Sequence, residues 1–162
     1  MLRRQQQGTS TVEFALVAAT LFLMFFGVFE IGRGYYIYSM LDEVTRRGAR
    51  LAAVCPVADP AIPQMAIFNA SGVADDSSLV YGLTPAHVVI DYLDAGANVV
   101  GNPATVAGFA QIRYVRARVV GFDHAVNLPF LAGISSVRMP DFESILPRES
   151  LGIPRDEVVT PC

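Results

Sequence analysis

The stretch GTSTVEFALVAATLFLMFFGVFEIGRGYYIYSMLDEVTRRGARLAAVC, residues 8–55, decides how this chain folds. Its central part, FALVAATLFLMFFGVF at residues 14–29, contains no charge and is flanked by the acids Glu13 and Glu30. As a helix this run is ~24 Å long, which spans a hydrocarbon core of about 30 Å if both acids lie at the interfaces and the bilayer thins slightly. The sequence therefore predicts a transmembrane segment at about 14–29.

The helix is predicted to continue beyond the membrane, from about Ser10 to Val54. Pro56 ends it, because the residue before a proline is pushed out of helical geometry. One narrow apolar stripe recurs at steps of four and three residues: Ile37, Leu41, Val44, Gly48, Leu51 and Cys55. Two acid-first ion pairs are expected on the opposite side, Asp42 with Arg46 and Glu43 with Arg47. The second half of the helix is thus amphipathic.

Beyond the helix the apolar pattern changes to a period of two. HVVIDYL (residues 87–93) and RYVRARVV (residues 113–120) alternate as half-buried strands do, and SSVRMPDFESIL (residues 135–146) supplies a third strand in which Pro140 favours an edge or a bulge. We expect a short helix at 64–69 and a loop or flap between the first two strands. The predicted fold is α+β: a long N-terminal helix packed on a small antiparallel sheet.

Charge and composition set the topology. The chain has 162 residues, is 52% hydrophobic and carries a net charge of −3, which gives no reason to expect nucleic acid as a partner. Arg3 and Arg4 stand directly before the apolar run, and a basic flank of this kind stays in the cytoplasm. We therefore expect a single-pass membrane protein whose residues 56–162 lie outside the cytoplasm.

The chain has two cysteines, one directly after the predicted helix and one at the last position. In an oxidising compartment, Cys55 and Cys162 would tie the C-terminus to the helix end, whereas two unpaired thiols are the alternative. Two such ligands do not make a metal site.

No pattern indicates catalysis, a metal or a cofactor. His87 and His124 are the only histidines, and neither belongs to a ligand motif or to a nucleophile motif. They are interpreted as surface or loop residues, and Arg113, Arg116 and Arg118 as a solvated strand face. The chain is accordingly not expected to be an enzyme.

Glu13 has two interpretations when taken alone. Ser10 and Glu13 form a capping box that suits a helix start, but a carboxylate at the edge of a membrane helix is also a functional candidate. Its context resembles the class III signal of type IV pilins. In that signal a short basic leader, here residues 1–8, ends in a glycine before the cut, and a glutamate followed by an apolar helix comes five residues later. Cleavage would then fall between Gly8 and Thr9, before Glu13 and Phe14.

Several motifs in order make the resemblance narrower. The stretch is similar to the TadE-like family, pilin-like proteins of the tight-adherence (Tad, or Flp) pilus, which carries the glycine, the Glu-Phe pair, a G-x-x-E-x-G-R segment and an R-x-G-A-R-x-A-A helix end. The residues of the last two motifs here are Gly27, Glu30, Gly32 and Arg33, then Arg46, Gly48, Ala49, Arg50, Ala52 and Ala53. The segment around LPFL (residues 128–131) also looks like the C-terminal half of the family.

The resemblance implies a minor pilin-like subunit, or pseudopilin, that supports pilus assembly, surface adhesion and biofilm formation. Its implied partners are a prepilin peptidase and other Tad pilins, TadF-like or Flp-like. Its implied location is the bacterial inner membrane, with residues 56–162 as a periplasmic domain, and incorporation into the extracellular pilus is a further implied location. After cleavage, Glu13 would pair with the Thr9 amine of a neighbouring subunit. The alternatives are a single-pass periplasmic protein of unrelated structural role and a secreted enzyme behind a signal peptide. The latter would lose everything to about Phe29, but no signal-peptidase site follows that residue.

Overall fold

The computed structural model describes residues 6–70, 72, 75–126, 136–153 and 162, and the side chains from residue 8 onward. The basic pair Arg3 and Arg4 and the segment 128–131 lie outside the described residues. The chain divides into two compact units, Met1–Tyr36 with His124–Val137 and Ile37–Asp123 with Arg138–Cys162. The long helix contributes to both of them.

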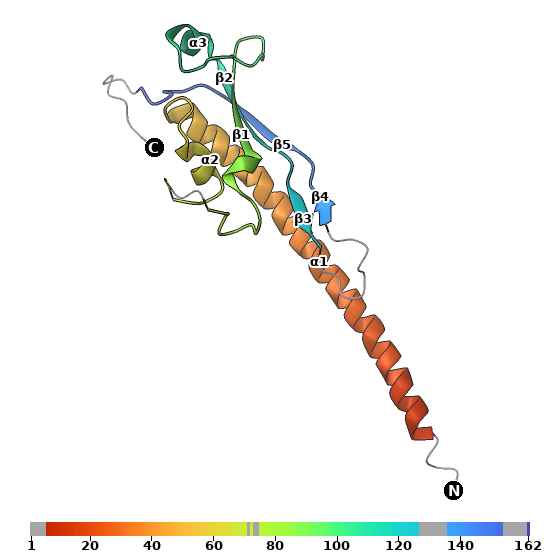
Figure 1. Cartoon of the computed structure of the whole chain (residues 1–162). Coiled ribbons are helices and arrows are strands. Elements are labelled where there is room, and N and C mark those ends of the chain that lie inside the picture. The colour runs from red at the N-terminus through yellow and green to blue at the C-terminus, as the bar shows by residue number, and fades with distance from the viewer. Residues whose placement is uncertain (1–5, 71, 73–74, 127–135, 154–161) are drawn as a thin grey trace. The chain divides into compact units, whose positions relative to one another are not determined.

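Helix α1 (Gln6–Val54) is the first element and covers the predicted helix (Figure 1). It ends at Val54 as predicted, two residues before Pro56, and extends on its N-terminal side to Gln6 rather than to Ser10. In the described chain Ser10 is therefore an interior helical residue.

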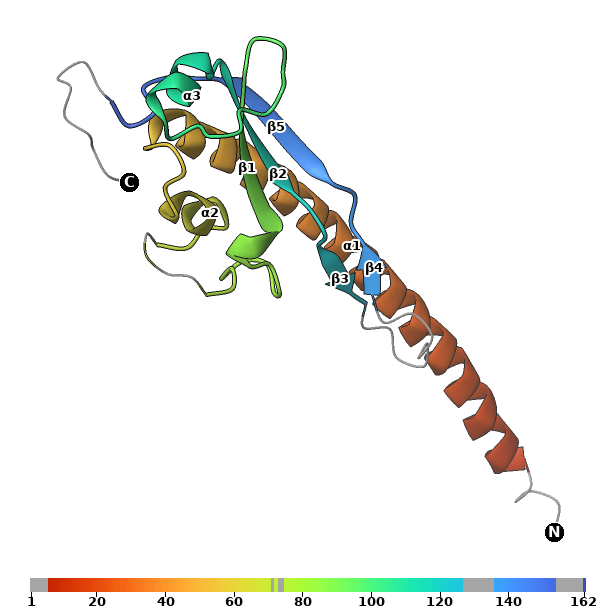
Figure 2. The ribbon, with the colours of Figure 1, turned by 45° about the horizontal axis from the view of Figure 1, so that its top comes forward.

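The larger sheet has the order β1-β2-β5, formed by β1 (Val88–Leu93), β2 (Tyr114–Val119) and β5 (Phe142–Pro147). Both pairings are antiparallel, with Ile90 opposite Ala117 and Ala117 opposite Ser144. The three strands run beside the C-terminal half of α1 in both ribbon views (Figures 1 and 2). The predicted α+β class, with a long helix on a small antiparallel sheet, is confirmed.

The core forms where the apolar stripe of α1 meets the inner face of this sheet. Alternate residues of β2, namely Val115, Ala117 and Val119, are buried, as the period of two predicts. From α1 the buried side chains include Ile37, Leu41, Val44, Ala49, Ala52 and Ala53, and Cys55, directly after the helix, is buried as well. Leu51 is only partly buried, while Thr45, which no pattern singled out, is fully buried and donates its hydroxyl to the Asp42 carbonyl.

The predicted third strand is divided in two. Pro140 has no N–H to donate to a ladder, and it lies between β4 (Ser136–Arg138) and β5. Strand β4 pairs instead with β3 (Asp123–Ala125) in a separate two-stranded sheet.

The other connections contain more structure than the sequence predicted. The short helix near the prolines is α2 (Ala61–Ala66), three residues earlier than expected, and it packs beside β1 (Figure 2). The connection between β1 and β2 contains helix α3 (Val106–Gln111), capped by the Thr105 hydroxyl, so the predicted loop or flap is wrong there. At its start Asp94 accepts the backbone N–H groups of Gly96 and Asn98, which closes a tight turn.

The C-terminal end of α1 is held by the segment that follows β5. Ala53 and Val54 have carbonyl groups that no further helical turn can satisfy, and these accept N–H groups from Glu149, Leu151 and Gly152. Gly152 has a φ of +81°, and a Cβ there would lie 2.7 Å from Pro56, so only glycine fits this approach. Next to this contact Cys55 and Cys162 form a disulfide bond, with their Cα atoms 5.7 Å apart.

Replacing both cysteines by serine is expected to lower the free energy of unfolding. The bond joins residues 107 positions apart, and closing a loop of that length is worth up to about 4.7 kcal/mol in the chain-entropy account. Urea unfolding of the detergent-solubilised protein, followed by near-UV circular dichroism, measures the loss, and reduction of the wild-type protein should reproduce it. Two free thiols in the unreduced, unfolded wild-type protein would contradict the bond.

Candidate functional site

The residues predicted for proteolysis and assembly lie on the exposed first turns of α1. Gly8, Thr9, Glu13 and Phe14 are all exposed, with Phe14 at 75%. Nothing lies within 4 Å of the position that a Cβ on Gly8 would take. Thr9 and Glu13 are four residues apart on the helix, so they share one face.

The structure weakens the capping interpretation of Glu13. A capping box needs the serine at the residue before the first helical turn, where its side chain meets free backbone N–H groups. Here the helix is already formed at Gln6, so Ser10 lies inside it. In the uncut chain, Glu13 therefore has no helix start to cap.

The apolar run that follows has no protein cover. Apart from Ala18 and Gly27, all residues from 14 to 29 are exposed, including large side chains such as Met24 at 70% and Phe29 at 71%. Among the described helices one, Gly8–Val54, is long and apolar enough to cross a membrane, with a mean hydropathy of 2.3 in its most apolar window. A surface of this size and polarity suits lipid or other apolar helices.

At the end of this run, the two charged residues of the G-x-x-E-x-G-R motif, Glu30 and Arg33, contact each other. Arg33 donates from Nη2 to Glu30 Oε1 over 3.0 Å, one helical turn away, and also to the carbonyl of Ala125 on β3. Gly27 and Gly32 have open space where a Cβ would be. The motif thus connects helix α1 to residue 125 through a single guanidinium group.

His124 completes this cluster and corrects a prediction. It was expected on the surface or in a loop, but it lies on β3 with 6% of its area exposed, and its Nε2 atom is 3.4 Å from Glu30 Oε1. The geometry leaves Nε2, like Arg33 Nε, without a hydrogen bond among the described residues. Burial lowers the pKa of His124, the nearby Arg33 charge lowers it further, and Glu30 opposes both effects. The imidazole is therefore mainly neutral near pH 7.

The R-x-G-A-R-x-A-A motif, which begins at Arg46, lies where α1 meets the sheet. Arg46 forms the predicted ion pair with Asp42, at 2.6 Å, and Arg50 is exposed. The expected pair of Glu43 with Arg47 is wrong. Arg47 instead donates from Nε to the Met65 carbonyl and lies over the Phe68 ring.

Gly48 is buried where α1 lies close to β2 and α2. A Cβ at this position would stand 3.2 Å from Ala117 Cβ on β2 and 3.4 Å from Ala66 Cβ on α2. Three small residues thus let three elements meet, and a larger side chain at Gly48 would push them apart.

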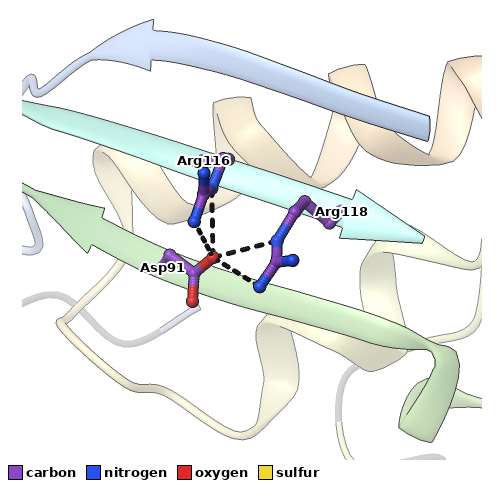
Figure 3. Close-up of polar contacts among 3 residues, drawn as sticks. All are labelled: Asp91, Arg116 and Arg118. Carbon is purple, nitrogen blue, oxygen red and sulfur yellow. Dashed lines mark hydrogen bonds and ion pairs between the residues drawn. The ribbon is translucent and has the colours of Figure 1, made fainter. Parts of the chain in front are cut away.

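Asp91 organises the outer face of the sheet, which the sequence analysis treated as simply solvated. Its Oδ2 atom accepts hydrogen bonds from Arg116, at 2.8 and 3.1 Å, and from Arg118, at 3.0 Å (Figure 3). The strand register places Asp91 opposite Arg116, so the alternation of the two strands, once they were paired with each other, would have predicted this cluster. Arg113, the third arginine of the predicted stripe, donates instead to the carbonyls of Ala110 and Ile112.

His87 serves local structure. It ends the 3-10 helix η1 (Pro85–His87), and its Nδ1 atom accepts the N–H of Thr84 at 3.1 Å while lying 2.9 Å from the Thr84 hydroxyl. It is half-buried, with an edge-to-face contact to Phe122.

One segment of α1 contains all of these features: the exposed residues from Gly8 to Phe14, the charged pair Glu30 and Arg33, and the closely packed Gly48. Residues 8–50 match the family model described as TadE-like protein. The TadE-like family predicted from the motifs is thereby confirmed for this segment. No curated protein and no solved structure matches the chain. The match supports a pilin-like protein associated with the Tad pilus.

Within the TadE-like segment, Gly48→Leu is expected to lower the free energy of unfolding by about 1–3 kcal/mol, the usual cost of overpacking a filled core. Gly34→Leu is the matched control, because a Cβ at Gly34 meets nothing within 4 Å. Urea unfolding of both variants in the same detergent compares them. If both substitutions lowered the free energy of unfolding equally, close packing at Gly48 would not be the cause of the loss.

Proposed function

We propose that this chain is a minor pilin-like subunit of a Tad pilus, trimmed after Gly8 by a prepilin peptidase and held in the bacterial inner membrane by α1. The observation that carries the proposal is the order of Gly8, Glu13 and Phe14 at the very start of the TadE-like match, all exposed and directly followed by an uncovered apolar helix. A peptidase can reach such a site, and neighbouring helices can pack on it.

Cleavage would create the group that Glu13 lacks. No described residue pairs with Glu13 in the uncut chain, and an unpaired carboxylate among apolar helices is costly. Removing residues 1–8 frees the Thr9 amine, which lies on the face of α1 that carries Glu13. Pairing the amine of one subunit with Glu13 of the next would neutralise both charges and fix the axial register of adjacent helices.

In the proposed topology the unit that contains β1, β2 and β5 (Ile37–Asp123 with Arg138–Cys162, here called the sheet-bearing unit) lies in the periplasm. Its disulfide between Cys55 and Cys162 is typical of an oxidising compartment. We propose that this unit contributes to pilus assembly, surface adhesion and biofilm formation together with other Tad pilins, TadF-like or Flp-like.

Processing is tested by the N-terminal sequence and intact mass of the protein from hosts with and without the matching prepilin peptidase. A mature chain that begins at Thr9 only where the peptidase is present is the expected result. Gly8→Leu should keep its leader in both hosts, because a side chain is introduced at the cut, while Gly27→Leu, also in open space, should be trimmed normally. An intact leader on the wild-type protein in both hosts would reduce α1 to an ordinary membrane anchor, and loss of residues to about Phe29 would indicate a secreted protein.

Assembly is tested with Glu13→Ala. This variant should insert and be trimmed, but at least about tenfold less of it should be recovered with its pilin partners, since about 1.4 kcal/mol of lost pairing corresponds to that factor. Glu43→Gln, which removes another exposed acid of α1, is the control. Co-purification from membranes solubilised in mild detergent measures recovery. Wild-type recovery of Glu13→Ala would show that pairing at this position does not drive assembly.

A further inference from the structure

The cluster of Glu30, Arg33 and His124 is used neither by the proposed cleavage nor by the proposed pairing of Glu13. It stands at the end of the apolar run, in the unit that contains Met1–Tyr36 and His124–Val137. We propose that these three residues form a pH-sensitive clasp that holds residues 124 and 125 of β3 on α1 while His124 is neutral and releases them when His124 is protonated. The inference does not depend on processing at Gly8.

The contacts of the clasp are few and shared. One guanidinium group donates both to Glu30 Oε1 and to the Ala125 carbonyl, so it binds helix and strand at once. The imidazole of His124 approaches the same carboxylate oxygen at 3.4 Å. The side chains of Glu30 and His124 are only 11% and 7% exposed, so water screens these charges poorly.

Charge counting gives the direction of the switch. With His124 neutral, the clasp holds one negative and one positive charge, which cancel. Protonation adds a second positive charge beside Arg33, in a place where burial already penalises it, and the single carboxylate must then serve two cations. The protonated imidazole is better accommodated in water, and reaching water requires residue 124 to leave α1.

The other charged groups near the strands do not replace this balance. Asp123, beside His124 on β3, and Arg138 on β4 are both exposed, so solvent screens them. Among the described residues, the charges that face the imidazole are therefore Glu30 and Arg33, both on α1.

The pH dependence follows from linkage. The folded state holds His124 with a lowered pKa, so the unfolded or released strand binds the proton more tightly. The contribution of the clasp is fully present above the ordinary histidine pKa of about 6.5 and is lost as the pH falls through the lowered value. Acidification, and not alkalinisation, is expected to open it. In the proposed topology the clasp faces the periplasm and would respond to external acid.

The test is hydrogen exchange of the full-length protein in detergent micelles between pH 7.5 and pH 4.5, corrected for intrinsic exchange and read at β3 and β4. The ring resonances of the two histidines give their titrations in the same samples. The exchange at β3 and β4 should rise in a step at the His124 titration, by about tenfold for each unit by which the pKa is lowered. His124→Gln, which stays neutral, should abolish the step, and His87→Gln should keep it.

Two further variants separate a switch from a merely structural contact. Arg33→Gln removes the guanidinium that binds helix and strand at once, so exchange at β3 and β4 should be fast at both ends of the pH range. Glu30→Gln removes the attracting acid and should move the step to lower pH. A step that is absent from the wild-type protein, or that persists in His124→Gln, overturns the proposal, as does a midpoint that Glu30→Gln moves to higher pH.

Discussion

Burial of one stripe of α1 against the inner face of sheet β1-β2-β5 is the constraint on which the rest of the structure depends. A lone helix is only marginally stable in water, and a three-stranded sheet with an uncovered apolar face would aggregate. Each supplies the cover that the other lacks, and at Gly48 the helix comes so close to Ala117 of β2 that a Cβ on Gly48 would crowd it. Because small residues set this distance, large side chains such as Leu41 and Val44 fill the space farther along the helix.

The same constraint accounts for the tie at the end of the helix. A helix that ends at Val54 leaves carbonyl groups without partners, and the chain returns at residues 149–152 to satisfy them. The disulfide then fixes the neighbouring Cys55 to the last residue. Backbone hydrogen bonds and a covalent bond thus act at the same point, which keeps the sheet-bearing unit closed around the helix end.

The sequence predicted the features that depend on apolar periodicity and on helix-ending residues such as Pro56. It did not predict those that depend on contacts between residues far apart in the chain. The helix end at Pro56, the alternation in β2 and the α+β class follow from local patterns and are confirmed. The burial of His124 could not be predicted, because its partners Glu30 and Arg33 are far away in the sequence and an isolated histidine carries no signal of its own. Likewise, α3 is too short for its apolar periodicity to be distinguished from a glycine-containing loop. Arg47 donates to the Met65 carbonyl on α2 rather than to Glu43, one helical turn away.

The two acids that flank the apolar run differ in how their charge is compensated. In a helix long and apolar enough to cross a membrane, both stand at the ends of the uncharged run, but Glu30 is compensated within the chain by Arg33, with His124 beside it. Glu13 is exposed, and among the described residues nothing compensates it. An acid that is already paired can be buried in a finished subunit, whereas an unpaired one must find a cation elsewhere or remain hydrated. The two ends of the run therefore differ in kind: Glu30 has its cation within the subunit, whereas Glu13 would need one from elsewhere, which is what the proposed pairing with a neighbouring subunit would supply.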